Sequence, residues 1–311
     1  MVKFRELIGL GLFLSICLVA AEEVPQADPF IKQLLNGVVE DEIRKTVQAL
    51  QGFKSRALGQ QGNADAGAYL HKRLSDLPNL SVEYQDEKLR NVIGTLKGTD
   101  TGSTAVFMVG AHYDSIAKDP LNAPGATDDG AGVGVVLEFA RILSRQKLRH
   151  TVKFAFWNGE EAGLKGSISY AMQAAKKKED IRLYVNCDSI GYDPQNRLIL
   201  DIMFANNASA IKDLMVANNN LYGIGFKLQF NQHNCGADHT PFVRQGYKAI
   251  MMHQEDHGHQ HTPDDTIDKV STRYAALVGK LALSVLAAQA EPVREKAPSE
   301  ISPPAPAEVR R

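Results

Sequence analysis

The chain of 311 residues lacks an excess of charge of either sign. Its 35 lysine and arginine residues nearly balance 36 aspartate and glutamate residues, which leaves a formal net charge of -1 at pH 7. A protein this close to neutrality has no strong overall field to attract a polyanion or an anionic membrane. The composition therefore argues against nucleic acid or a membrane surface as a partner.

Long hydrophobic runs are scarce as well. A run of about 15 residues, LIGLGLFLSICLVAA, follows Lys3 and Arg5 and ends in small side chains at Ala21. It is shorter than the ~20 residues that a helix needs to cross a membrane. We therefore predict a cleaved signal peptide over residues 1–21 rather than an uncleaved anchor. The mature protein is then expected to be secreted or periplasmic and free of the membrane.

Cysteine is rare, with three in the whole chain. Cys17 lies in the predicted signal peptide, so Cys187 and Cys235 remain after cleavage. An exported protein can keep a disulfide, but two cysteines far apart in the sequence do not show that they meet in the fold. The sequence therefore does not decide whether Cys187 and Cys235 form a disulfide.

The rest of the sequence alternates between strand patterns and helix patterns. Apolar runs typical of strands buried on both faces occur at residues 104–114, 151–161, 181–192 and 247–256, and an alternating strand pair at 81–98. Helical periodicity occurs at residues 29–50, 63–77, 128–146, 166–178, 209–220 and 271–289.

This alternation predicts one three-layer α/β/α domain, in which helices cover both faces of a mixed, mostly parallel central sheet. We assign the domain to residues 22–290. The segment 291–311 is rich in proline and charge, and we predict that it is a disordered tail.

Five polar clusters follow predicted strands or lie in loops beside them. They are GAHYDS with His112 and Asp114, PGATDDGAG with Asp128 and Asp129, the pair Glu160 and Glu161, VNCDSIGYD with Asp188, and the loop from His253 to Thr266. In an open α/β sheet, ligands bind outside the carboxyl ends of the strands. Crowded carboxylates would repel one another there unless cations neutralised them.

The donor types indicate which cations fit. Imidazoles and carboxylates without thiolates suit zinc, or manganese or cobalt. There are more donors than one tetrahedral ion needs, which favours two ions that share a bridging carboxylate. Taken singly, each cluster has an ordinary explanation: Asp128 could cap a helix, and Glu160 and Glu161 could be a solvated strand end. The hypothesis rests on their joint occurrence.

With these motifs, the sequence resembles the co-catalytic di-zinc aminopeptidases of metallopeptidase family 28. The marks of that family are H-x-D, G-A-x-D-D/N-G, E-E, D-x-x-G and H-T-x-x-D-T, and all five occur here in this order within residues 56–288. The resemblance implies a zinc-peptidase fold and two zinc ions, for which Co2+ or Mn2+ could substitute. It also implies peptide substrates with a free N-terminus.

The resemblance also assigns the metal ligands. Asp128 would bridge an ion held by His112 and Asp188 to an ion held by Glu161 and His261. The alternatives to His261 in the same loop are histidines 253, 257 and 259, and the context HTPDDT favours His261.

Further roles follow from the same resemblance. Glu160 would be the general base that takes a proton from a water shared by the ions. Asp114 would orient the imidazole of His112, and Asp265 could do the same for the last histidine ligand. Asp238 and His239, in CGADHTPF, are candidates for shaping the pocket.

The function expected from these features is that of an exported zinc-dependent aminopeptidase. One alternative is a glutaminyl-peptide cyclotransferase, a class that shares the fold and uses one zinc. A family carboxypeptidase and a receptor ectodomain with a decayed metal site are two more. The full set of donors favours the aminopeptidase, and the chain lacks the large added domains usual in the carboxypeptidases.

Overall fold

The computed structural model describes residues 26–232, 236–254 and 258–293. The predicted signal peptide lies outside these ranges, as does the predicted tail apart from its first three residues. Both therefore stay predictions. None of the helices within the described ranges combines the length and the apolar character that crossing a membrane requires.

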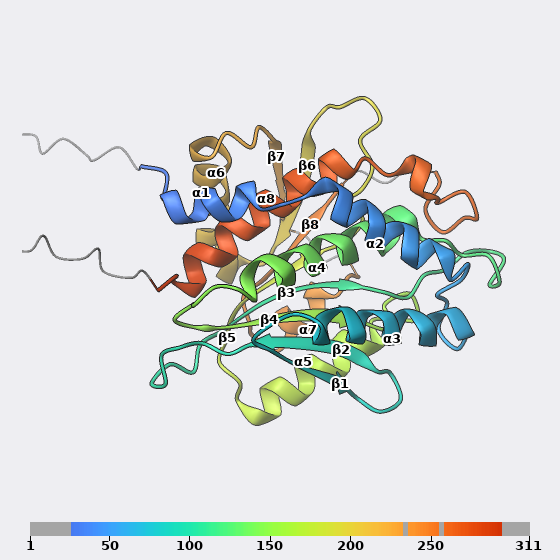
Figure 1. The fold of residues 1–311 in the computed structure, drawn as a ribbon, viewed down its shortest axis with the longest axis horizontal. Helices are drawn as coiled ribbons and strands as arrows, with labels where there is room; N and C mark the ends of the chain where they lie inside the picture. The colour runs from blue at the N-terminus through green and yellow to red at the C-terminus, as the bar shows by residue number, and fades with distance from the viewer. Residues whose placement is uncertain (1–25, 233–235, 255–257, 294–311) are drawn as a thin grey trace, which may run out of the picture.

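Eight strands form one mixed sheet in the order β1-β2-β4-β3-β5-β8-β6-β7 (Figure 1). The strands are β1 (Leu80–Gln85), β2 (Asn91–Leu96), β3 (Val106–His112), β4 (Thr151–Trp157), β5 (Ile181–Cys187), β6 (Ile199–Phe204), β7 (Lys227–Asn231) and β8 (Ala249–His253). The pairs β3–β4, β3–β5, β5–β8 and β6–β7 are parallel, and the pairs β1–β2, β2–β4 and β6–β8 are antiparallel.

The α-helices of the described residues lie in two layers around this sheet. They are α1 (Pro29–Asn36), α2 (Glu40–Gly52), α3 (Gln61–Ser75), α4 (Ala131–Leu143), α5 (Lys165–Lys177), α6 (Ser209–Leu221), α7 (His239–Arg244) and α8 (Thr272–Ala290). In Figure 1, α2 and α4 lie above the strands β3 and β4, and α5 lies below these two strands.

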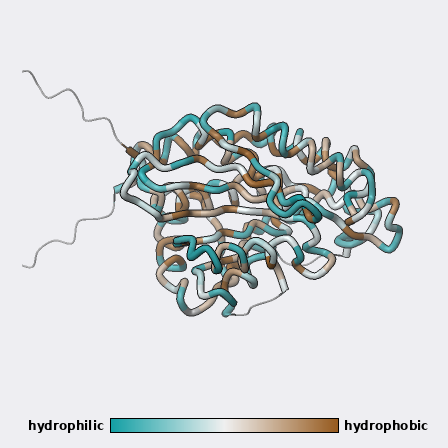
Figure 2. Tube along the Cα trace, turned by 90° about the horizontal axis from the view of Figure 1, so that it is seen from below, coloured by the Kyte–Doolittle hydropathy of each residue, from teal (hydrophilic) through white to brown (hydrophobic). Residues whose placement is uncertain are grey.

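Two separate cores show that the sheet is covered on both faces. Successive side chains of a strand point to opposite faces. Along β3, Phe107 and Val109 pack in the larger core with residues of α2, α4 and α8. Val106 and Met108 pack in the smaller core with residues of α5 and α7. Figure 2 shows hydrophobic segments through the middle of the molecule. The predicted three-layer α/β/α domain is confirmed.

Four parallel strands place the polar clusters at one edge of the sheet. The strands β4, β3, β5 and β8 are neighbours, and their side chains are almost entirely buried. The ladder pairs His112 with Trp157 and Cys187 with Met252, so the four strands end at nearly the same level. The segments that follow these strands therefore share one side of the molecule.

The sequence analysis assigned no strand to β6 or β7 and no helix to α7. Both strands alternate between more buried and more exposed side chains, and they lie beyond β8 at one side of the sheet. The region 29–50, expected to be helical, forms two helices that are interrupted between Asn36 and Glu40.

Candidate metal centre

The sequence clusters converge at the carboxyl edge of the sheet. His112 is the last residue of β3, and Asp188 directly follows β5. Glu160 and Glu161 follow β4 after two residues. Three parallel strands, or the segments just after them, thus supply these side chains. Ligands bind at this edge of the sheet in α/β proteins.

Asp128 lies between two imidazole groups. One of its oxygens, Oδ1, is 3.0 Å from Nε2 of His112, and the other, Oδ2, is 3.0 Å from Nε2 of His261. Asp128 sits in η1 (Ala126–Gly130), a π-type turn before α4, with non-helical backbone angles of φ -124° and ψ 92°. The expectation that it opens a helix is wrong, because α4 begins at Ala131 and has no side-chain cap.

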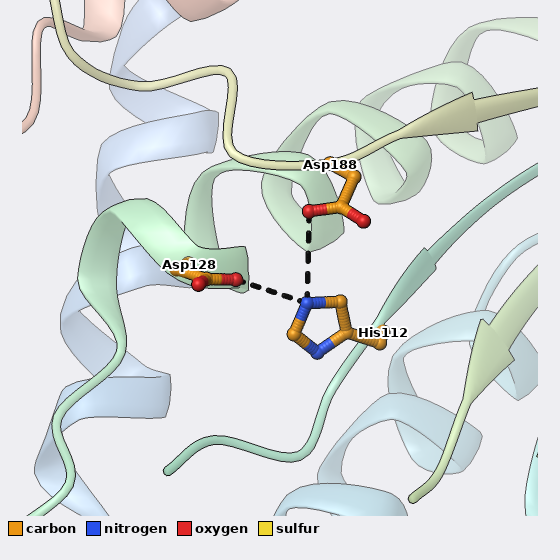
Figure 3. A group of neighbouring side chains, drawn as sticks. All are labelled: His112, Asp128 and Asp188. Atoms are coloured by element: carbon orange, nitrogen blue, oxygen red, sulfur yellow. Dashed lines mark hydrogen bonds and ion pairs between the residues drawn. The ribbon is translucent and has the colours of Figure 1, made fainter. Parts of the chain in front are cut away.

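The two imidazoles each face a second carboxylate. Figure 3 shows His112 with Asp128 and Asp188, and its Nε2 is 3.8 Å from Oδ1 of Asp188. Nε2 of His261 is 3.4 Å from Oε2 of Glu161. The donor atoms form two groups within 4.8 Å that share Asp128, one with His112 and Asp188 and one with Glu161 and His261. The structure therefore brings the five predicted ligands together in the predicted pairing.

Glu160 lies beside this cluster. Its carboxylate forms a further group within 4.8 Å with His112 and Glu161. Glu160 and Glu161 are neighbours in sequence, yet only Glu161 belongs to the group that contains His261. Both acids thus share a group with His112, and Glu161 alone also joins Asp128 and His261.

Asp114 is fully buried and fixes the segment that carries the two glutamates. Its Oδ1 accepts a hydrogen bond from the backbone N–H of Glu160, and its Oδ2 accepts one from that of Glu161, both at 3.1 Å. Nδ1 of His112 is 3.2 Å from the carbonyl oxygen of Asp114 but 3.6 Å from its carboxylate. The closer of these two acceptors for Nδ1 is thus the backbone carbonyl of Asp114, rather than the carboxylate expected from the sequence.

Asp265 fixes the other side of the centre. Its carboxylate accepts hydrogen bonds from the backbone and hydroxyl of Thr127 at 2.9 and 2.7 Å and from the backbone of Asp128 at 3.1 Å. The sequence analysis paired Asp265 with His261. In the structure, Asp265 instead orders the backbone of the carboxylate that lies between the imidazoles.

Arg56, which the sequence analysis missed, is completely buried beneath the site. Its guanidinium donates to the carbonyl oxygens of Tyr113 at 2.7 Å, Gly125 at 2.9 Å and Pro124. Gly125 has a positive φ of 53° just before η1. Arg56 therefore ties the end of β3 to the turn that carries Asp128, and a single arginine in a polar segment gave no sign of this role.

The pKa shifts of the cluster indicate that its carboxylates would be stabilised by additional positive charge. Burial raises the pKa of Glu160 to about 10 and that of Glu161 to about 8. The hydrogen bond with Asp128 raises the pKa of His261 to about 9. Burial alone would lower the pKa of His112, but the nearby carboxylates of Asp114 and Asp128 raise it well above the ordinary value.

The donor set fits divalent cations. Nδ1 of His112 can donate to the Asp114 carbonyl, which leaves the lone pair of Nε2 facing the Asp128 carboxylate. Two acceptors facing each other need a proton or a cation between them. Oε1 of Glu161 is buried and has no hydrogen-bond partner among the described residues. Imidazole and carboxylate donors without thiolates are those that zinc uses at catalytic sites.

A cavity of about 890 Å³ opens onto this cluster, and the five candidate ligands and Glu160 all line it. The sequence analysis could not place its other walls. They include an apolar group of Leu164, Ile168, Met203, Ala237 and Met251, together with Arg244. Met203 belongs to β6 and Arg244 to α7, two elements for which the sequence gave no assignment.

The remaining polar candidates lie around the cluster. His253 lines the cavity, and its Nδ1 is 3.2 Å from the carbonyl oxygen of Asp188. Asp238 is buried and accepts a short hydrogen bond from Ser167, while burial lowers the pKa of the neighbouring His239 to about 4. His257 and Cys235 lie outside the described residues, and Cys187 is a free, buried thiol.

Fold and site together define an α/β/α protein with a cluster of imidazole and carboxylate donors at the carboxyl edge of its sheet. The chain belongs to peptidase family M28, whose family model matches residues 91–286. The predicted family is thereby confirmed.

Curated relatives are similar over much of the chain. A protein described as "probable zinc metalloprotease" from Leptosphaeria maculans is 30% identical over 245 residues, which cover 64% of this chain and 57% of that protein. Leucine aminopeptidase 1 of Phaeosphaeria nodorum is 26% identical, with 84% of this chain and 73% of that protein covered. The chain spans about half to two-thirds of the length of four such zinc metalloproteases.

Solved structures share the fold. The LapA aminopeptidase of Legionella pneumophila matches with a TM-score of 0.76 at 19% identity, covering 88% of this chain and 78% of LapA. A glutaminyl cyclase of Bacteroides thetaiotaomicron matches with a TM-score of 0.64 at 21% identity, covering 80% of this chain and 97% of that one. At these identities the likeness concerns the fold, so the choice between the two activities depends on the site.

Proposed function

We propose that this protein is a zinc-dependent aminopeptidase that hydrolyses the N-terminal peptide bond of peptides. The observation that carries the proposal is the position of Asp128 between two imidazoles, each backed by a further carboxylate. His112 and Asp188 would hold one zinc ion, Glu161 and His261 would hold the second, and Asp128 would bridge them. The names of the curated relatives, zinc metalloprotease and leucine aminopeptidase, support the same function.

The chain supplies a proton carrier beside these ligands. When bound, two zinc ions would lower the pKa of water and polarise the scissile carbonyl group. Glu160 would take a proton from the attacking water and deliver it to the nitrogen of the leaving amine. As the C–N bond breaks, the water oxygen stays on the acyl product. Asp114 holds the backbone of Glu160 in position for both transfers.

The carboxylates that line the cavity would also favour substrates with a free amino terminus over substrates with a blocked one. Four carboxylates line the cavity, those of Asp128, Glu160, Glu161 and Asp188. Carboxylate oxygens beside the metal sites would accept hydrogen bonds from a free terminal amino group, and an acylated terminus would lose hydrogen bonds of this kind. We also propose that the protein acts after export, in the periplasm or outside the cell, because of the sequence of residues 1–21.

Three substrates distinguish this function from its alternatives. We expect cleavage of a chromogenic leucine amide with a free amine and no cleavage of its N-acetylated form. Cyclisation of a peptide with N-terminal glutamine would point instead to a cyclotransferase, whose fold this chain shares. Absence of all three reactions in protein that binds no metal would favour a non-enzymatic role and would contradict the proposal.

A further inference from the structure

Arg244 stands apart from the other residues of the cavity wall. It is the one lysine or arginine among the described residues that line this cavity. It is the last residue of α7, its side chain is exposed, and it forms no ion pair with a carboxylate among the described residues. A guanidinium at the same cavity as four carboxylates, yet paired with none of them, suggests that its counter-charge comes from a ligand.

The remaining wall provides the rest of a small-molecule site. The apolar side chains of Leu164, Ile168, Met203 and Met251 line the cavity together with the acidic cluster and the arginine. The volume of about 890 Å³ lies within the range of roughly 300–1,000 Å³ typical of sites for small ligands. A peptide of a few residues, with an ammonium group at one end and a carboxylate elsewhere, matches these charges.

We infer that Arg244 is a specificity-determining residue that binds a carboxylate of the peptide substrate. The planar guanidinium can form two parallel hydrogen bonds with a carboxylate, a geometry that lysine cannot reproduce. The carboxylate belongs either to the C-terminus of a short peptide or to an acidic side chain. This inference rests on the proposed aminopeptidase function and names the substrate class of that site.

A purely structural role for Arg244 makes different predictions. A basic residue in the last turn of a helix interacts favourably with the helix dipole. Such a role would affect the stability of the protein, and it would change the KM values of charged and uncharged peptides alike. Only a role in binding makes the KM depend on the carboxylate of the substrate.

The experiment compares peptide pairs that differ in one carboxylate. The first pair is Leu-Gly-Gly with a free C-terminus and its C-terminal amide, and the second is Leu-Glu-amide and Leu-Gln-amide. In the wild type, we expect the KM of the carboxylate member of one pair to be lower by about 3- to 10-fold, the range for the net contribution of a typical hydrogen bond. The pair that shows the difference identifies the source of the carboxylate.

Substitutions of Arg244 test whether this residue causes the preference for the carboxylate member of the pair. In Arg244→Gln the KM ratio of that pair should fall to about one, and Arg244→Lys should keep part of it. The kcat should change little, because the contact lies away from the reacting bond and acts equally on substrate and transition state. Arg145→Gln, at an exposed position outside the cavity, is the matched control and should keep the wild-type ratio.

A wild-type ratio near one for both pairs, or a ratio that Arg244→Gln leaves intact, would overturn the inference without affecting the aminopeptidase function. If the protein cleaved no peptide at all, the proposed function would fail first. Calorimetric binding of the same pairs to zinc-loaded protein then decides: equal affinities overturn the inference, and a preference lost in Arg244→Gln supports it.

Discussion

At the scale of single residues, Glu160 and Glu161 show how neighbours can differ in role. The carboxylate of Asp114 accepts hydrogen bonds from both backbone N–H groups. Both side chains share a group of donors with His112, but only Glu161 also joins Asp128 and His261. The proposed function therefore gives two identical neighbours different roles, with Glu161 as a metal ligand and Glu160 as the proton carrier.

Removing the proton carrier should separate binding from catalysis. We expect Glu160→Gln to keep both metal ions and to lose about 10²- to 10⁴-fold in kcat, the usual contribution of a general base. Glu161→Gln should instead lose metal, because it removes a ligand. Metal analysis of both purified variants beside their kinetics checks this. Loss of zinc from Glu160→Gln alone would mean that ligand and base are interchanged.

The buried carboxylate of Asp114 should matter for stability as well as for activity. Asp114→Asn keeps one acceptor and turns an NH2 group towards a backbone N–H of the glutamate segment. An unsatisfied buried donor costs about 1–3 kcal/mol, so urea unfolding should show a loss of this size. Asp213→Asn, at an exposed position on α6, should stay within ~0.5 kcal/mol of the wild type. Equal effects of the two substitutions would contradict the role of Asp114.

At the scale of elements, the buried parallel strands were predictable and the rim of the site was not. Near-continuous apolar runs marked β3, β4, β5 and β8, and the polar residues that follow them marked the ligand edge. The strands β6 and β7 lie near one side of the sheet, and they alternate between more buried and more exposed side chains instead of forming an apolar run. Met203 and Arg244 reach the cavity from β6 and α7, so the sequence could not show the walls that determine specificity.

Hydrogen bonds between distant segments could not be predicted from the sequence either. Arg56 bonds to three backbone carbonyls, and Asp265 bonds to the turn before α4. Both depend on segments that are distant in sequence. A pattern of residue types can identify metal donors through their chemistry, but it does not show which backbone a lone charged residue will reach.

The close approach of α4 to the end of β5 offers a test of element packing. A Cβ added at Gly132 would overlap with the Asp129 carboxylate and with the carbonyl of Cys187, just before the candidate ligand Asp188. Overpacking of this kind costs about 1–3 kcal/mol, so Gly132→Ala should lower the free energy of unfolding and weaken zinc binding. Gly52→Ala has open space around it and is the control. Unchanged zinc affinity in Gly132→Ala would show that this contact does not position the site.

At the scale of the whole molecule, stability should depend on pH through the metal centre. In chelated protein, the native pKa values of His261 and Glu161, about 9 and about 8, lie above their ordinary values. The native state then binds more protons than the unfolded chain, so stability falls as pH rises from about 5 to 9. Bound cations replace these protons, and metal binding strengthens as pH rises.

The difference in melting temperature between zinc-loaded and chelated protein should therefore be larger at pH 8.5 than at pH 6. Thermal unfolding at both values, with the zinc concentration held constant, measures it. The same difference at both values would show that the buried acids and imidazoles are not the groups that bind the metal.

The pairing of two cations across Asp128 is tested most directly by anomalous X-ray diffraction from crystals of the zinc-loaded protein. We expect two zinc peaks on either side of the Asp128 carboxylate, one beside His112 and Asp188 and the other beside Glu161 and His261. A single peak, or peaks away from Asp128, would contradict the two-ion centre and the mechanism built on it.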